Sequence, residues 1–271
     1  MSMRSAVVAG QFYPDETDVL RHMVEEYMAH SRVTPEPERV VGVVVPHAGY
    51  IYSGQTAGFA YARIRGKKPK RAILLGGSHR YPIEHASVFD AGGFESPLGS
   101  FPVDEGFAKT LAAKTDSTTI RPHMYEHSLE VQLPFLWVAL GPVPIVPVLF
   151  GGPPSGWHVN VGRMLAEMVD DQDLVIASTD LSHYLPDDAA HETDKRTVDT
   201  VLGKDSTALI DGLARERCSM CGAAAVVAAM AFASARGATA WSLLDYRTSA
   251  QSSGDYTRVV GYAAISMERE S

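Results

Sequence analysis

Three short apolar runs, each followed by a histidine, constrain the fold of this chain more than any other feature of its sequence. None of them alternates apolar with polar residues, a pattern typical of strands buried on both faces of a parallel sheet. The runs and their histidines are Val40–Val45 with His47, Ala72–Leu75 with His79, and Leu174–Ala177 with His183. Because the intervening segments include stretches with helical spacing, the sequence predicts an α/β protein with a mixed, largely parallel central sheet.

The position of the histidines predicts a shared site. Parallel strands send their carboxyl ends to one edge of the sheet, where α/β proteins bind ligands. A single histidine after a strand is commonly a loop residue that hydrogen-bonds to backbone. Three histidines at one edge instead favour a metal site built from converging imidazoles.

The remaining elements follow from periodicity and turn residues. Helices are predicted over residues 15–30, 55–64, 104–114, 125–140, 157–169, 187–202, 206–213 and 223–235, and further strands over 144–151, 240–247 and 258–267. Gly92 and Gly93 favour an antiparallel hairpin across residues 86–99. Asp15 and Asp104 are predicted to cap their helices. No repeat or shift in composition divides the chain, so we expect one domain over residues 1–271.

The helix expected at 125–140 would place His127 and Glu130 on one face near its N-terminus, three residues apart. We interpret Glu126 and Glu130 as complementing the helix dipole in the first turn. A charged imidazole is unfavourable in that position. His127 is therefore expected to be neutral and to have a polar partner.

Composition excludes several classes of protein. The net charge is -8 and the 24 lysines and arginines are dispersed apart from one short run, which argues against a nucleic-acid partner. The sequence has neither a secretory apolar segment nor a long apolar span, so we expect a cytoplasmic protein that does not enter a membrane.

The two cysteines, Cys218 and Cys221, give no disulfide framework. They could form a redox pair or half of a zinc site, or Cys221 alone could complete a site with the histidines at a helix N-terminus. The sequence by itself leaves these three alternatives open. For Cys218 we expect a buried small side chain.

Six ordered motifs give the chain a family resemblance. They are AGQFYP, VPHAGYIYSG, LLGGSH, EHSLEVQLPFL, STDLSHY and MCG. In this order and at these separations the motifs resemble those of the Memo family, including bacterial and archaeal members encoded beside a radical-SAM protein. The resemblance spans nearly the whole chain. Memo proteins in turn resemble the class III extradiol ring-cleaving dioxygenases, and this implies a single-domain α/β sandwich.

The resemblance also implies a ligand set. It places the metal ligands at His47, His79 and Cys221, and further pocket residues at His127, Asp180 and His183. In the dioxygenases two histidines and a glutamate hold non-haem Fe(II), whereas the Memo pattern has the cysteine in place of the glutamate. A thiolate shifts the preference of a site toward Cu(I), Zn or a differently poised iron. From the resemblance to the dioxygenases we expect Fe(II), and the cysteine makes Cu or Zn the alternatives.

These features lead to a functional hypothesis. We expect a metal-dependent redox enzyme, dioxygenase-like in its pocket, that acts on a small and possibly aromatic substrate and has a functional link to a radical-SAM protein. His127 or His183 would be the general acid or base, Asp180 would orient one of these rings, and Tyr13, Tyr50 and Tyr52 would line the substrate pocket. The alternatives are a non-catalytic module that binds a peptide or protein in the same pocket, and a zinc hydrolase.

Overall fold

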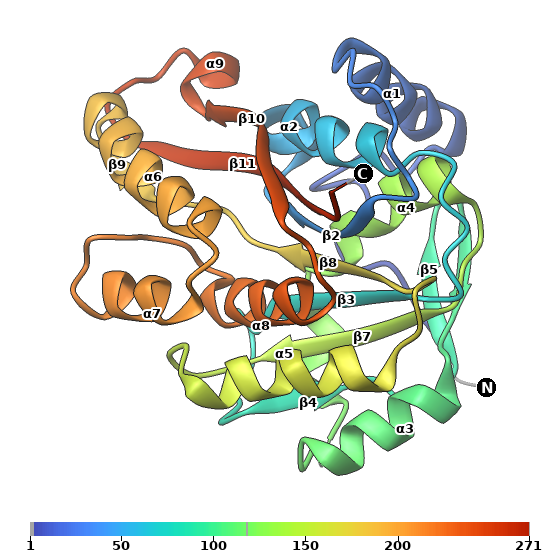
Figure 1. Cartoon of the computed structure of the whole chain (residues 1–271). Helices are drawn as coiled ribbons and strands as arrows, with labels where there is room; N and C mark the ends of the chain where they lie inside the picture. The colour runs from blue at the N-terminus through green and yellow to red at the C-terminus, as the bar shows by residue number, and fades with distance from the viewer. Residues whose placement is uncertain (1–2, 118, 271) are drawn as a thin grey trace.

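A computed structural model describes residues 3–117 and 119–270, and within them the chain forms one large mixed sheet with helices on both faces (Figure 1). That sheet has eight strands in the described residues, in the order β10-β11-β2-β8-β3-β7-β4, with β9 pairing onto β11. A smaller sheet of the order β1-β5-β6 lies beside it. The prediction of an α/β fold with a mixed, largely parallel central sheet is confirmed.

The four central strands run parallel to one another. They are β2 (Val40–Val45), β8 (Leu174–Ser178), β3 (Ala72–Gly77) and β7 (Ile145–Phe150), and every residue in them is buried. Antiparallel strands complete the sheet: β4 (Ala86–Val88), β9 (His183–Leu185), β10 (Ala240–Thr248) and β11 (Val259–Glu268). The three apolar runs of the sequence therefore lie next to one another, as expected, and their carboxyl ends point the same way.

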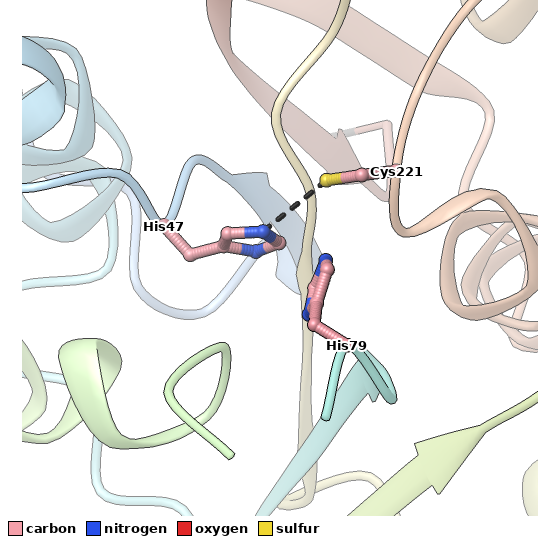
Figure 2. A group of neighbouring side chains, drawn as sticks. All are labelled: His47, His79 and Cys221. Carbon is pink, nitrogen blue, oxygen red and sulfur yellow. Dashed lines mark hydrogen bonds between the residues drawn. The ribbon is translucent and has the colours of Figure 1, made fainter. Parts of the chain in front are cut away.

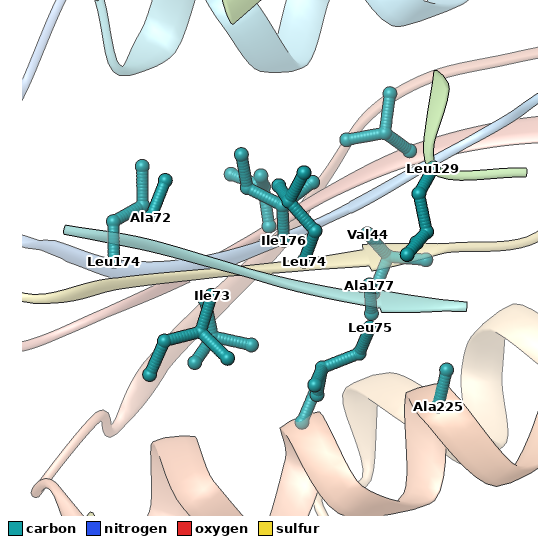
Figure 3. Packing of buried hydrophobic residues seen from close by; sticks show 14 of the residues in the cluster. Val44, Ala72, Ile73, Leu74, Leu75, Leu129, Leu174, Ile176, Ala177 and Ala225 are labelled. Carbon is teal, nitrogen blue, oxygen red and sulfur yellow. The ribbon is translucent and has the colours of Figure 1, made fainter. Parts of the chain in front are cut away.

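Two groups of helices cover the faces of the sheet (Figure 1). One face carries α1 (Thr17–His30), α2 (Tyr50–Arg63) and α4 (Leu133–Leu140), and the other carries α5 (Gly156–Met168), α6 (Asp187–Leu202), α7 (Ser206–Ala214) and α8 (Ala223–Ala235). Figure 3 shows the core between these layers, with Leu129 above the central strands and Ala225 of α8 below them. None of the helices in the described part of the chain is long and apolar enough to cross a membrane.

Close packing of α1 against α2 depends on glycine. A Cβ atom at Gly58 would lie 2.5 Å from the carbonyl oxygen of Tyr27. The two helices also begin at positions other than those predicted: Glu16, not Asp15, is the N-cap of α1, and α2 begins at Tyr50, five residues early. The prediction for α3 (Glu105–Lys114) is confirmed, because the Asp104 side chain accepts a hydrogen bond from the backbone of Phe107.

The predicted hairpin over residues 86–99 is wrong. Its first half, β4, pairs with β7 in the main sheet, and its second half, β5 (Gly93–Ser96), pairs with β6 (Gly99–Pro102) and with β1 (Met3–Arg4). The turn residues were recognised correctly, but tertiary contacts chose the strand partners. A short helix, α9 (Ala250–Ser253), also occupies part of the predicted loop between β10 and β11.

The predicted helix over residues 125–140 is wrong in its first half. Two 3-10 turns, η1 (Arg121–Tyr125) and η2 (Glu130–Gln132), precede α4. The α-helix starts only at Leu133, with Pro134 in its first turn, where a missing N–H costs nothing. Residues 126–129 form a loop with a turn at Ser128 and Leu129, so His127 does not lie on a helix.

Candidate metal centre

Three side chains meet beyond the ends of the central strands. His47 follows β2, His79 follows β3, and Cys221 lies directly before α8 (Figure 2). One ligand atom from each lies within 4.8 Å of the other two, and the Sγ of Cys221 is 3.2 Å from the Nε2 of His47. Because the carboxyl ends of parallel strands lie at one edge of the sheet, two of the three predicted histidines lie close together. The fold adds the cysteine from a segment more than 140 residues away in sequence.

Hydrogen bonds fix the tautomer of His47. Its Nδ1 lies 2.9 Å from the Oγ of Ser178, which donates its only proton to the carbonyl of Ser128 at 2.6 Å. Ser178 must therefore accept a proton from Nδ1, and the lone pair of His47 is left on Nε2. Gln132 donates a further hydrogen bond to the same hydroxyl at 3.0 Å, so the network is complete. His47 is 2 % exposed, and its Nε2 faces the thiol of Cys221.

A buried carboxylate orients His79 in a similar way. The Oε1 of Glu126 is 3.0 Å from His79 Nδ1, and its Oε2 accepts the backbone N–H of His79 at 2.6 Å. Burial opposes the charged imidazole, but the hydrogen bonds that its ring donates to Cys221 and Glu126 outweigh this effect and raise the pKa of His79 to about 9. Burial would also raise the pKa of Glu126, yet its contacts with His79 and the N–H of Ser128 hold it well below the usual range. Because Nδ1 is held by Glu126, Nε2 is the nitrogen of His79 that would bind a metal ion, and it would lose its proton on doing so.

Hydrogen bonds from backbone and side chain hold the turn that carries Cys221. The N–H of Asp180 points at Sγ from 3.3 Å. Thr179 supports the turn, because its hydroxyl accepts the N–H of Gly222 at 2.8 Å and donates to the carbonyl of Asp180 at 2.8 Å. Gly222 is required here, since a Cβ at this position would meet Thr179 Cβ at 2.8 Å.

The donor set fits a transition-metal ion. Metal–nitrogen distances near 2.0 Å and metal–sulfur distances near 2.3 Å require ligand atoms roughly 3 to 4 Å apart, about the separation of His47 and Cys221. Both imidazoles also have their second nitrogen held by a polar partner, the arrangement found around ligating histidines.

His127 lies beside this group but is held differently. Its ring centroid is 5.3 Å from that of His47 and 4.8 Å from that of His79. Burial and the charges of the two other histidines lower its pKa to about 3, so the ring is neutral, as predicted. Its Nδ1 is 3.2 Å from Glu126 Oε1, but within the described residues it has no hydrogen-bond partner of suitable geometry, so the prediction of a polar partner is wrong.

The dipole interpretation of Glu126 and Glu130 is wrong. Glu126 orients His79, and Glu130 is fully buried and contacts Arg4 at 2.8 Å and the hydroxyl of Tyr13 at 2.8 Å. Neither lies in the first turn of an α-helix. These carboxylates hold separate segments of the chain together, which sequence spacing could not reveal.

The structure places Asp180 and His183 apart from the roles expected for them. Asp180 Oδ1 accepts the backbone N–H of His47 at 2.7 Å, so it fixes the loop rather than a ring. His183 lies in β9, exposed, with Nδ1 2.9 Å from the carbonyl of Leu181. In the part of the chain that the structure describes, His183 does not lie among the side chains that could hold a metal ion.

Two cavities lie near the centre. One of about 120 Å³ is lined by His79, Cys221, Phe150 and small residues of the neighbouring loops, β3 and α8. Tyr13, Tyr50 and Tyr52 line a separate cavity of about 340 Å³. The hydroxyl of Tyr50 donates to the carbonyl of Val131, so this ring is anchored in the core, whereas Tyr52 is 39 % exposed.

Cys218 takes no part in the centre. It is buried, both cysteines are free thiols, and its Sγ lies 3.7 Å from the hydroxyl of Thr200. The prediction of a buried small side chain is confirmed.

Sequence reasoning missed the residues that orient the ligands. Ser178, Gln132 and Glu126 make hydrogen bonds over 46 to 131 positions in sequence. The only local signal was their place within or beside the six motifs.

Comparisons with known proteins agree with the resemblance seen in the sequence. The family model described as "Memo-like protein" matches residues 4–266. A MEMO1 family protein of Methanopyrus kandleri is 35% identical over 280 residues, which covers 98% of this chain and 99% of the relative. One of Methanosarcina acetivorans is 35% identical over 272 residues, with 99% and 100% coverage. The crystal structure of an uncharacterized protein from Escherichia coli K12 shares the fold at a TM-score of 0.57 and 13% identity, covering 84% of this chain and all of that one.

Proposed function

Because this chain belongs to the Memo family, we propose that it is a metal-dependent redox enzyme that acts on a small substrate. The observation that carries the proposal is the convergence of His47, His79 and Cys221, whose ligand atoms lie within 4.8 Å of one another. Each imidazole has its Nδ1 held by a buried partner, so both Nε2 atoms are prepared for one ion.

The ligand types favour a redox-active ion. Two imidazoles and a thiolate suit Fe(II) or copper, and zinc is the alternative without redox chemistry. When bound, iron or copper would supply the one-electron and O₂ chemistry that amino-acid side chains lack. Cys221 stands where the extradiol dioxygenases have a carboxylate ligand. We therefore propose that the enzyme oxidises its substrate, and ring cleavage is not part of the proposal.

The chain's own residues would bind and orient the substrate. We assign the acid–base role to His127, because its neutral ring lies against both ligand histidines. It can accept a hydrogen bond from a substrate hydroxyl. His183, which is exposed, is the weaker candidate.

The size of the cavity favours a small substrate. At about 120 Å³ it is close to the roughly 150 Å³ that holds benzene in an engineered cavity. A molecule with a single ring, such as a catechol or an aminophenol, is therefore the class of substrate to test first.

Metal content is the first test. Wild type, Cys221→Ser and Cys218→Ser are purified without oxygen, loaded with Fe(II) and analysed for metal per chain. Cys218→Ser is the matched control, because it makes the same change at a buried thiol outside the centre. We expect near-stoichiometric iron in the wild type and the control, and a loss of about 10-fold or more in affinity for Cys221→Ser.

Oxygen consumption separates the alternatives. A redox enzyme should consume O₂ with one of the small aromatic substrates, and Cys221→Ser should lose that activity. Stoichiometric zinc with activity that is independent of oxygen would favour the hydrolase. The absence of bound metal from the wild type after loading would contradict the proposal and favour a binding module.

A further inference from the structure

Strand β1 contributes a buried arginine to the loop that carries Glu126. Arg4 is 1 % exposed, and its guanidinium lies over the ring of Phe94, 4.8 Å from the ring centroid. Its charge is balanced by Glu130, whose Oε2 is 2.8 Å from Nη1 and which is itself fully buried. A buried arginine is costly unless its N–H groups are satisfied, so its other partners show which segment it holds.

Two of those partners are backbone carbonyls of the segment that runs from η1 into the loop after it. The Nε of Arg4 donates to the carbonyl of His123 at 2.6 Å, and Nη2 donates to the carbonyl of Glu126 at 2.5 Å. The planar guanidinium therefore fixes two points of this loop while a third N–H engages Glu130. Lysine would keep the charge, but its single ammonium lacks the rigid fork that binds all three oxygens together.

The second of these carbonyls belongs to the residue that orients His79. The Glu126 carboxylate accepts hydrogen bonds from both Nδ1 and the backbone N–H of His79, at 3.0 and 2.6 Å. Any shift of the Glu126 backbone would move this carboxylate. The direction in which His79 Nε2 points therefore depends on the position of the loop that Arg4 holds.

We propose that Arg4 is a positioning residue of the metal centre, which acts through the backbone of Glu126 on the orientation of His79. This inference rests on the proposed metal-binding function. In the described part of the chain, the hydrogen bonds of the Arg4 side chain go to Ser5, His123, Glu126 and Glu130, so it acts on affinity without being a ligand. Outer-shell changes typically weaken metal binding by about 10- to 100-fold, and we expect about 10-fold for Arg4→Lys.

Arg71 offers a matched control. It is also a buried arginine, with Asp173 at 3.1 Å and the ring of Phe107 at 4.4 Å from its guanidinium. It directly precedes β3, whereas His79 follows that strand, so the two lie at opposite ends of it. Arg71→Lys should lower the thermal stability as Arg4→Lys does, but it should leave metal affinity unchanged.

The test measures Co(II) affinity without oxygen, by titrating full-length folded protein and following the thiolate-to-cobalt absorption band. The proteins are wild type, Arg4→Lys, Arg4→Gln, Arg71→Lys, Glu126→Gln and the double variant Arg4→Lys/Glu126→Gln. If Arg4 acts through Glu126, the double variant should bind Co(II) no more weakly than Glu126→Gln alone. Weaker binding by Arg4→Lys, with Arg71→Lys unchanged, is the expected result.

Other results overturn the inference in distinguishable ways. If the wild type binds Co(II) and Arg4→Lys binds it equally well, Arg4 serves only the fold, and the proposed function stands. Additive losses in the double variant would likewise reject action through Glu126. Failure of both Arg4→Lys and Arg4→Gln to fold would assign the residue to folding alone. A wild type that binds no metal would remove the proposed function and this inference together.

Discussion

Replacing Ser178 by alanine tests the hydrogen-bond network that prepares His47. The hydroxyl is fully buried and serves three groups: Nδ1 of His47, Nε2 of Gln132 and the carbonyl of Ser128. Each group would lose a partner in a site closed to water, at about 1 kcal/mol per group, so the variant should lose about 3 kcal/mol of unfolding free energy. That corresponds to a fall in Tm of about 6 °C for a chain of this size.

Ser178→Ala should also weaken metal binding. Without its acceptor at Nδ1, His47 is free to move its proton to Nε2, which removes the lone pair that faces Cys221. We expect a loss of about 10-fold in Fe(II) affinity. Urea unfolding gives the stability, and anaerobic titration gives the affinity.

Ser87→Ala is the control for this measurement. Ser87 is also buried, but among the described residues its hydroxyl makes one hydrogen bond, to the carbonyl of Thr119 at 2.6 Å. Ser87→Ala should lose only about 1 kcal/mol of unfolding free energy and bind Fe(II) as tightly as the wild type. Equal destabilisation of the two variants, together with unchanged metal affinity in Ser178→Ala, would refute the reasoning about the tautomer.

Two further predictions concern stability. Burial lowers the pKa of His123 to about 3, below the 6.5 of the unfolded chain, so the folded state should lose stability as the pH falls from 6.5 toward 3. Between pH 7.5 and pH 5 the free energy of unfolding of the wild type should fall by about 2 kcal/mol more than that of His123→Gln. Urea unfolding at each pH measures both values, and the same pH dependence in the two proteins would contradict the prediction. In α5, a Cβ at Gly162 would collide with the carbonyl of Ala228, so Gly162→Ala should destabilise the protein by about 1 to 3 kcal/mol. Gly156 lies at the start of the same helix with open space around it, so Gly156→Ala should instead stabilise the protein by about 0.5 kcal/mol. A higher Tm for Gly162→Ala than for Gly156→Ala would show that packing does not determine the effect of these substitutions.

Much of the fold follows from patterns that are local in sequence. The runs at residues 40–45, 72–75 and 174–177 are strands because continuous apolar, mostly β-branched and aliphatic segments are stable only when both faces are covered. The helix at 223–235 was predicted to the residue, since an almost wholly apolar segment between Gly222 and Arg236 has clear limits. Where a neighbouring residue could also be the N-cap, as at the start of α1, the predicted start of the helix was wrong by a residue or two.

Strand pairing depended on distant segments. The chain at 86–99 has the turn residues of a hairpin, but β4 pairs with the buried strand β7, and β5 pairs with β6 and β1. Likewise, the helix expected from residue 125 was interrupted because Glu126 and Glu130 engage His79 and Arg4. Spacing along the chain says nothing about such partners.

The sequence by itself determined the residue types of the centre. It placed His47 and His79 after parallel strands, whose common direction brings the ends to one edge, and it identified Cys221 by the family resemblance. The tertiary structure decided which groups converge: it left His183 exposed, moved Asp180 onto the backbone of His47, and supplied Ser178 and Glu126 as partners of the ligand rings. The physical reason is that a strand end fixes the position of a residue, whereas the direction of a buried imidazole depends on hydrogen bonds from segments that only folding brings together.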